Sequence, residues 1–183
     1  MAYASRVLLR TLVARSLVAL LVPLLVGCGR PAAKPRQEKA ASSVSNALHA
    51  PPPSFLHYPG KGGAIEPWVQ EQVELADAAQ LRVLVYVGAS WCEPCQRFHE
   101  AVERGELNGT LNGLRFLEFD QDQDAAALKT AGYIYQYIPV LALPDPDGRN
   151  HGKMISGSIK GPRAIQGDLV PRLQALLNGQ AVD

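Results

Sequence analysis

The residues best suited to chemistry in this sequence are two cysteines, two residues apart, in the stretch Trp91-Cys92-Glu93-Pro94-Cys95. A cysteine thiolate is both a nucleophile and a ligand for soft metals. Such a pair can therefore exchange with other disulfides, bind a metal or form a structural bridge. The apolar residues 83–87 predict a buried strand just before the pair, and residues 92–105 predict a helix just after it.

A cysteine at this junction of strand and helix is expected to be reactive. The free N–H groups and the positive end of the helix dipole favour the thiolate of Cys92 over its thiol. Cys95 lies one turn further on, and we expect it to be less exposed and to attack the mixed disulfide that Cys92 forms. Trp91 is expected to shield the pair and to offer an apolar contact surface.

The pattern W-C-x-P-C after an apolar strand resembles the thioredoxin superfamily. A second match, Tyr137-Ile138-Pro139-Val140, opens a later strand, and the resemblance covers roughly residues 65–178. It implies a cis peptide bond before Pro139, facing the cysteines, so that the backbone at Ile138 and Pro139 pairs with an extended substrate. It also implies that no cofactor is needed, because the electrons travel as thiols.

Two departures from the family pattern bear on the mechanism. Tyr86 stands where many thioredoxins carry a buried aspartate, and a phenol with an ordinary pKa near ~10 is a poor base at neutral pH. We therefore expect either proton transfer by water or slower turnover. Glu93 replaces a glycine, and its charge is expected to disfavour the thiolate and make the couple more reducing. Pro94 and Ile138 also resemble the reducing branch, so the predicted activity is protein-disulfide reduction, with an oxidase or isomerase as the alternative.

The order of predicted elements indicates an α/β fold. We expect a thioredoxin-like three-layer sandwich over residues 64–183, with a mixed central sheet and helices on both faces. Asp122 or Asp124 is expected to cap a short helix and Asp168 to cap the last one. The predicted strands are residues 81–87, 114–119, 139–143 and 153–155, and the predicted helices are residues 67–79, 92–105, a segment ending near 132 and a final segment ending near 179.

The first residues predict a signal peptide for export. Residues 1–27 combine three arginines with an apolar run, residues 16–26, that is about half as long as a membrane-spanning helix. Leu25-Val26-Gly27-Cys28 resembles a bacterial lipobox, which implies cleavage before Cys28 and a lipid on its sulfur. Gly29 after it favours the outer membrane under the same resemblance. Residues 28–63, rich in Pro, Ala and Ser, predict a flexible tether.

These features together predict a lipid-anchored protein of the cell envelope that faces the periplasm. The implied partners are disulfide-containing envelope proteins and a membrane electron donor that recycles the cysteines. The formal net charge of +1, with no basic excess, argues against nucleic-acid binding.

Two other readings of the cysteine pair remain. An inert structural disulfide is one, although a bridge that closes so small a loop adds little stability. The other is a lipoprotein that binds or delivers Cu or Zn, with His99 one turn after Cys95. Zinc prefers four ligands and the sequence has no second cysteine pair, so no metal site is predicted.

Overall fold

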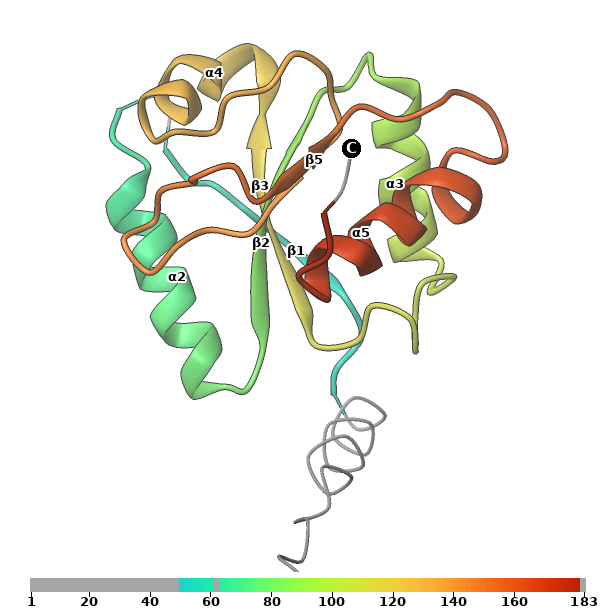
Figure 1. The fold of residues 1–183 in the computed structure, drawn as a ribbon, viewed down its shortest axis with the longest axis horizontal. Coiled ribbons are helices and arrows are strands. Elements are labelled where there is room, and N and C mark those ends of the chain that lie inside the picture. The colour runs from blue at the N-terminus through green and yellow to red at the C-terminus, as the bar shows by residue number, and fades with distance from the viewer. Residues whose placement is uncertain (1–49, 61–62, 182–183) are drawn as a thin grey trace, which may run out of the picture. The chain divides into compact units, whose positions relative to one another are not determined.

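The computed structural model describes residues 50–60 and 63–181 (Figure 1). The predicted signal peptide, Cys28 and most of the predicted tether lie outside the described residues. Within this part of the chain, every helix is too short or too polar to cross a membrane.

A five-stranded mixed sheet forms the centre of the domain, with the strand order β1-β3-β2-β4-β5. The strands are β1 (Ser54–His57), β2 (Arg82–Gly88), β3 (Leu114–Asp120), β4 (Val140–Ala142) and β5 (Met154–Ser156). β1 and β2 both run parallel to β3, whereas β4 runs antiparallel to both β2 and β5. The predicted mixed sheet is confirmed.

Helices cover both faces of this sheet, as the sequence predicts (Figure 1). Helices α2 (Glu66–Ala78) and α4 (Gln121–Thr130) pack on one face, and α3 (Glu93–Glu103) and α5 (Val170–Leu177) pack on the other. The alternation of side chains along β2 separates the two cores. Val83, Val85 and Val87 join the first, while Leu84 and Tyr86 join the second.

Strand β1 shortens the tether that the sequence predicts. The sequence assigns residues 28–63 to a flexible segment, yet Ser54–His57 pair in register with β3 at the edge of the sheet. Phe55 packs against the aromatic rings of Tyr86, Phe98 and Phe116, with centroids 5.3–6.0 Å apart. The folded domain therefore begins before residue 64, because this short strand packs a partly buried aromatic side chain against the core.

Two predicted helix caps are wrong. Asp120, not Asp122 or Asp124, caps α4, because its carboxylate accepts hydrogen bonds from the N–H groups of Asp122 and Gln123. The last helix is preceded by a π-helical turn, η1 (Ile165–Leu169), and has no side-chain cap. Asp168 instead accepts a hydrogen bond of 2.8 Å from the Ser158 hydroxyl.

Candidate active site

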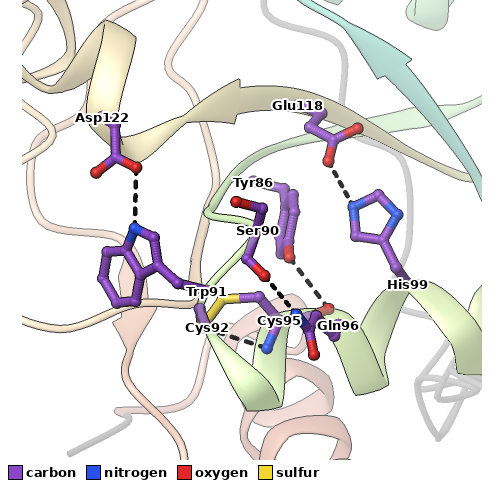
Figure 2. Close-up of a disulfide and its surroundings, with 9 residues drawn as sticks. All are labelled: Tyr86, Ser90, Trp91, Cys92, Cys95, Gln96, His99, Glu118 and Asp122. Atoms are coloured by element: carbon purple, nitrogen blue, oxygen red, sulfur yellow. Dashed lines mark hydrogen bonds and ion pairs between the residues drawn. A yellow bond between two sulfur atoms is a disulfide. The ribbon is translucent and has the colours of Figure 1, made fainter.

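The two cysteines lie where β2 passes into α3, as predicted. Cys92 is the N-cap residue of α3, with an extended backbone (φ −87°, ψ 106°), and its Sγ accepts a hydrogen bond of 3.3 Å from the Cys95 N–H. The two sulfur atoms are bonded to each other at 2.04 Å (Figure 2). Cys92 therefore sits at the positive end of the helix dipole, an environment that stabilises a thiolate once the bond is reduced.

The two cysteines line different depressions of the surface. Both are buried, Cys92 with 4% of its surface exposed and Cys95 with 2%. Cys92 lines a groove of about 740 Å³, here called the front groove, together with Trp91, Ile138, Gly157 and others. Cys95 lines a cleft of about 600 Å³, here called the rear cleft, whose lining includes Tyr86, His99, Glu118 and Asp124. An incoming substrate would meet Cys92 first.

Trp91 lines the front groove beside Cys92. Its side chain is 64% exposed, and its Nε1–H donates a hydrogen bond of 2.9 Å to Asp122 Oδ2 in α4 (Figure 2). Tyr137, which also lines this groove, is 68% exposed. Two large aromatic side chains thus stand in solvent beside Cys92, as suits a contact surface.

The predicted cis peptide bond is present between Ile138 and Pro139. Ile138 lines the front groove with Cys92, whereas Pro139 is buried and its carbonyl accepts the Gly157 N–H at 2.9 Å. Gly157 has φ +69°, and a Cβ atom there would lie 3.0 Å from Tyr137 Cβ. The positive φ favours glycine here, and a Cβ atom would require Tyr137 to shift by a few tenths of an ångström.

Glu93, between the cysteines, forms an ion pair. It is paired with Arg97 one turn along α3, and its carboxylate also accepts the Gly161 N–H at 3.2 Å. The hydrogen bond from Arg97 and the N–H of Gly161 lower the pKa of Glu93. Since Arg97 offsets part of this charge, we expect Glu93 to disfavour the Cys92 thiolate less than an unpaired carboxylate would.

Tyr86 lies in β2 behind the cysteines. Its hydroxyl donates a long hydrogen bond of 3.5 Å to the Cys95 carbonyl oxygen. Burial, together with the charge of Glu118, raises the pKa of this phenol far above its ordinary value. Tyr86 therefore cannot act as a base near neutral pH.

Sequence reasoning missed a histidine–carboxylate pair behind Cys95. His99 Nε2 lies 2.5 Å from Glu118 Oε1 (Figure 2). The imidazole also stacks on Phe55, with ring centroids 3.9 Å apart. Glu118 is opposite Tyr86 in the β2–β3 register and opposite His57 in the β1–β3 register. A charged residue inside the apolar strand of residues 114–119 was the available signal, but without β1 its neighbours could not be placed.

The other candidates for metal chemistry do not come together in the described segments. His151 is paired with Asp145 at 2.7 Å on an exposed turn, away from the cysteines. Across residues 50–60 and 63–181, the structure contains no group of three or more His, Cys, Asp or Glu side chains placed to hold a metal ion.

Comparison with known families agrees with this geometry. A protein family described as thioredoxin-like matches residues 64–146, which include both cysteines and the Ile138–Pro139 bond. The domain has a thioredoxin-like fold. A cysteine pair that forms a disulfide at a helix start in such a fold fits thiol–disulfide oxidoreductase chemistry in general.

Solved thioredoxin structures are among those similar to this chain. The thioredoxin of Trichomonas vaginalis is 22% identical, with 69% of this chain and 97% of that chain covered and a TM-score of 0.42. Thioredoxin O1 of Arabidopsis thaliana in its oxidized state is 17% identical, with 69% and 96% covered and a TM-score of 0.42. No curated protein matches the sequence.

Proposed function

We propose that this thioredoxin-like protein is a lipid-anchored oxidoreductase of the cell envelope that reduces protein disulfides through Cys92 and Cys95. The observation that carries the proposal is the position of Cys92, which caps α3 and lines the front groove while Cys95 lies behind it. This arrangement places Cys92 at the groove where a substrate would bind and leaves Cys95 behind it for the second step.

The reaction begins with both cysteines reduced. The Cys92 thiolate attacks one sulfur of the substrate disulfide, forms a mixed disulfide and releases the first substrate thiol. Cys95 then loses its proton and attacks Cys92 Sγ, which forms the Cys92–Cys95 bond and releases the second substrate thiol. Two electrons pass from the protein to the substrate, and no further cofactor enters the balance.

The front groove is suited to an extended peptide. Trp91 and Tyr137 offer apolar contact, and the backbone at Ile138 and Pro139 is expected to pair with the substrate chain. The partners are disulfide-containing proteins of the envelope. A membrane electron donor returns the oxidised pair to the dithiol state after each turnover.

The direction of the reaction is proposed as reduction. Pro94 and Ile138 support it through their resemblance to reducing relatives, and the charge of Glu93 supports it less strongly because Arg97 is paired with it. The reduction potential of the Cys92–Cys95 couple decides the direction. A value near ~−270 mV supports a reductase, and one near ~−120 mV would make the protein an oxidase.

The anchor is proposed from the sequence around Cys28. A lipidated Cys28 holds the domain at the membrane, and residues before β1 serve as the spacer. Cys28→Ser should move the protein from the membrane fraction to the soluble fraction and abolish labelling by a fatty-acid analogue. Unchanged fractionation and labelling would disprove the lipid anchor.

The activity is tested by reduction of insulin with dithiothreitol as the electron source. The wild-type protein should accelerate insulin precipitation, Cys92→Ser should abolish the acceleration, and Cys95→Ser should accumulate a mixed disulfide on Cys92. An acceleration that survives Cys92→Ser would rule out the proposed chemistry. Metal analysis of the reduced protein is run in parallel, because stoichiometric Cu or Zn would favour a delivery protein.

A further inference from the structure

Release of the substrate requires that Cys95 lose its proton while buried. A thiol attacks a disulfide only as the thiolate, and Cys95 is 2% exposed. Its neighbour Tyr86 offers a phenol whose pKa is raised by burial, so it cannot take this proton. The proton must leave through the rear cleft, the depression that Cys95 lines.

His99 shares the Cys95 side of helix α3. The two residues are four positions apart, a spacing that places side chains on one helix face, and both line the rear cleft. The imidazole is held in place by its stacking on Phe55 and by Glu118 Oε1, 2.5 Å from Nε2. The carboxylate contact favours the proton on Nε2, which leaves Nδ1 as the basic nitrogen.

The rear cleft also contains oxygen atoms that lack a hydrogen-bond partner. Glu118 Oε2 and Asp124 Oδ1 are buried and accept no hydrogen bond from the described residues. His57 Nδ1 lies 2.6 Å from that Glu118 oxygen, but the contact does not have hydrogen-bond geometry. Glu118 and Asp124 line a cleft that has room for several water molecules. Buried oxygens without a hydrogen-bond partner are sites where water binds.

We propose that the His99–Glu118 pair accepts the proton of Cys95, through water in the rear cleft, as Cys95 attacks the mixed disulfide. This inference rests on the proposed function and assigns a proton acceptor to its second step. The Cys95 S–H bond breaks, the proton passes to the imidazole, the Cys95–Cys92 bond forms and the substrate thiolate leaves. The substrate thiolate then takes up a proton from solvent or from the imidazolium, which restores the pair.

The other titratable groups of the rear cleft are less suited to the role. Asp124 Oδ2 accepts the Asp120 N–H at 3.0 Å, and Glu100 is paired with Arg104. An imidazole is the side chain best suited to take and return a proton at neutral pH. His57 is the other imidazole that lines this cleft, but it lies on β1 with its side chain 78% exposed, whereas His99 is one turn from Cys95 on α3 and only 26% exposed. Tyr58 and Asp120 are the remaining titratable residues of the lining.

The two attack steps are separated by rapid mixing of reduced protein with Ellman's reagent. The full chain carries Cys28→Ser, so that only Cys92 and Cys95 report. The first equivalent of thionitrobenzoate leaves when Cys92 attacks, and the second leaves when Cys95 resolves the mixed disulfide. In His99→Gln, we expect an unchanged first phase and a second phase about tenfold slower at pH 7.

The pH profile distinguishes proton transfer from a structural role. In the parent protein the second phase should rise with pH near neutrality. In His99→Gln and Glu118→Gln its midpoint should move to higher pH, towards the ordinary thiol value near ~8.5. The double variant should lose no more than His99→Gln alone, because the pair acts as one unit.

The matched control is His151→Gln, which removes a histidine from the exposed pair with Asp145. It should leave both phases unchanged. A second phase with unaltered rate and pH midpoint in both His99→Gln and Glu118→Gln would overturn the proton-acceptor role while leaving the proposed function intact. A first phase in the parent protein no faster than that of a peptide cysteine would overturn the proposed function itself.

Discussion

The backbone N–H of Gly161 donates a hydrogen bond of 3.2 Å to the carboxylate of Glu93, the residue after Cys92. The loop that follows β5 is thereby tied to the first turn of α3. Lys160, next to Gly161, lines the front groove with Glu93, so the contact fixes one wall of the groove. Glu93 is thus a structural link between two segments far apart in the sequence.

Removal of this link should loosen the loop. In Glu93→Ala, hydrogen exchange at the Gly161 amide should become several-fold faster, because the N–H loses its acceptor. The same substitution at Glu103, at the other end of α3, serves as the control and should leave that amide unchanged. Equal protection of Gly161 in the parent protein and in Glu93→Ala would show that the contact has no role in holding the loop.

The link should also respond to acid. The lowered pKa of Glu93 means that its stabilising contribution is present above the ordinary carboxyl pKa, near ~4.3, and is lost as the pH falls through the lower folded-state value. The protection factor of the Gly161 amide, corrected for intrinsic exchange, should therefore be constant at neutral pH and fall only in the acid range. A fall between pH 6 and 8 would point to another group.

The phenol of Tyr86 should be dispensable for turnover. Tyr86→Phe keeps the ring that packs against Phe55 and Phe98 and removes only the long hydrogen bond to Cys95 O. Insulin reduction should change less than twofold, and the free energy of unfolding should change by no more than about 1 kcal/mol. Tyr86→Ala, in contrast, should destabilise the protein by about 3–5 kcal/mol. A tenfold loss of activity in Tyr86→Phe would assign the phenol a chemical role.

Gly157 should tolerate a side chain less well than other glycines of the same conformation. Gly157→Ala places a Cβ atom 3.0 Å from Tyr137 Cβ in a residue with φ +69°. Gly152 has φ +93° and open space around it, so Gly152→Ala carries the backbone cost alone, about 1–2 kcal/mol. Gly157→Ala should lose more stability than Gly152→Ala and also lose activity. Equal losses by chemical denaturation would show that the contact with Tyr137 is relaxed easily.

Strand β1 should contribute to the stability of the domain. Phe55→Ala removes a ring that packs against Tyr86, Phe98, Phe116 and His99, and should cost about 2–4 kcal/mol. Ser54→Ala, at the exposed start of the strand, is the control and should change the stability little. An unchanged free energy of unfolding in Phe55→Ala, measured by denaturant titration, would show that β1 does not contribute to the stability of the core.

The sequence predicts the parts of the fold that local patterns determine. The apolar residues of β2 and the helix start at Cys92 lie next to each other in the chain, so the position of the cysteine pair follows from them directly. The resemblance to the thioredoxin superfamily predicts the cis bond before Pro139, and the structure has a cis bond there.

The remainder depends on contacts between distant segments. β1 has four residues with polar ends, too short a run to reveal a strand. Asp168 does not cap a helix; its carboxylate accepts a hydrogen bond from Ser158, in a loop ten residues earlier. The pairing of His99 with Glu118 requires α3 and β3 to be adjacent, and no local pattern in either segment indicates the other.

The reactivity of Cys92 tests the central claim most directly. The rate of alkylation of the reduced protein by iodoacetamide is measured against pH, with Cys92→Ser as the background. A thiol that caps α3 should ionise with a midpoint well below the ordinary value near ~8.5 and react at neutral pH faster than a peptide cysteine. A midpoint at or above ~8.5, with a neutral rate equal to that of the peptide, would contradict the account.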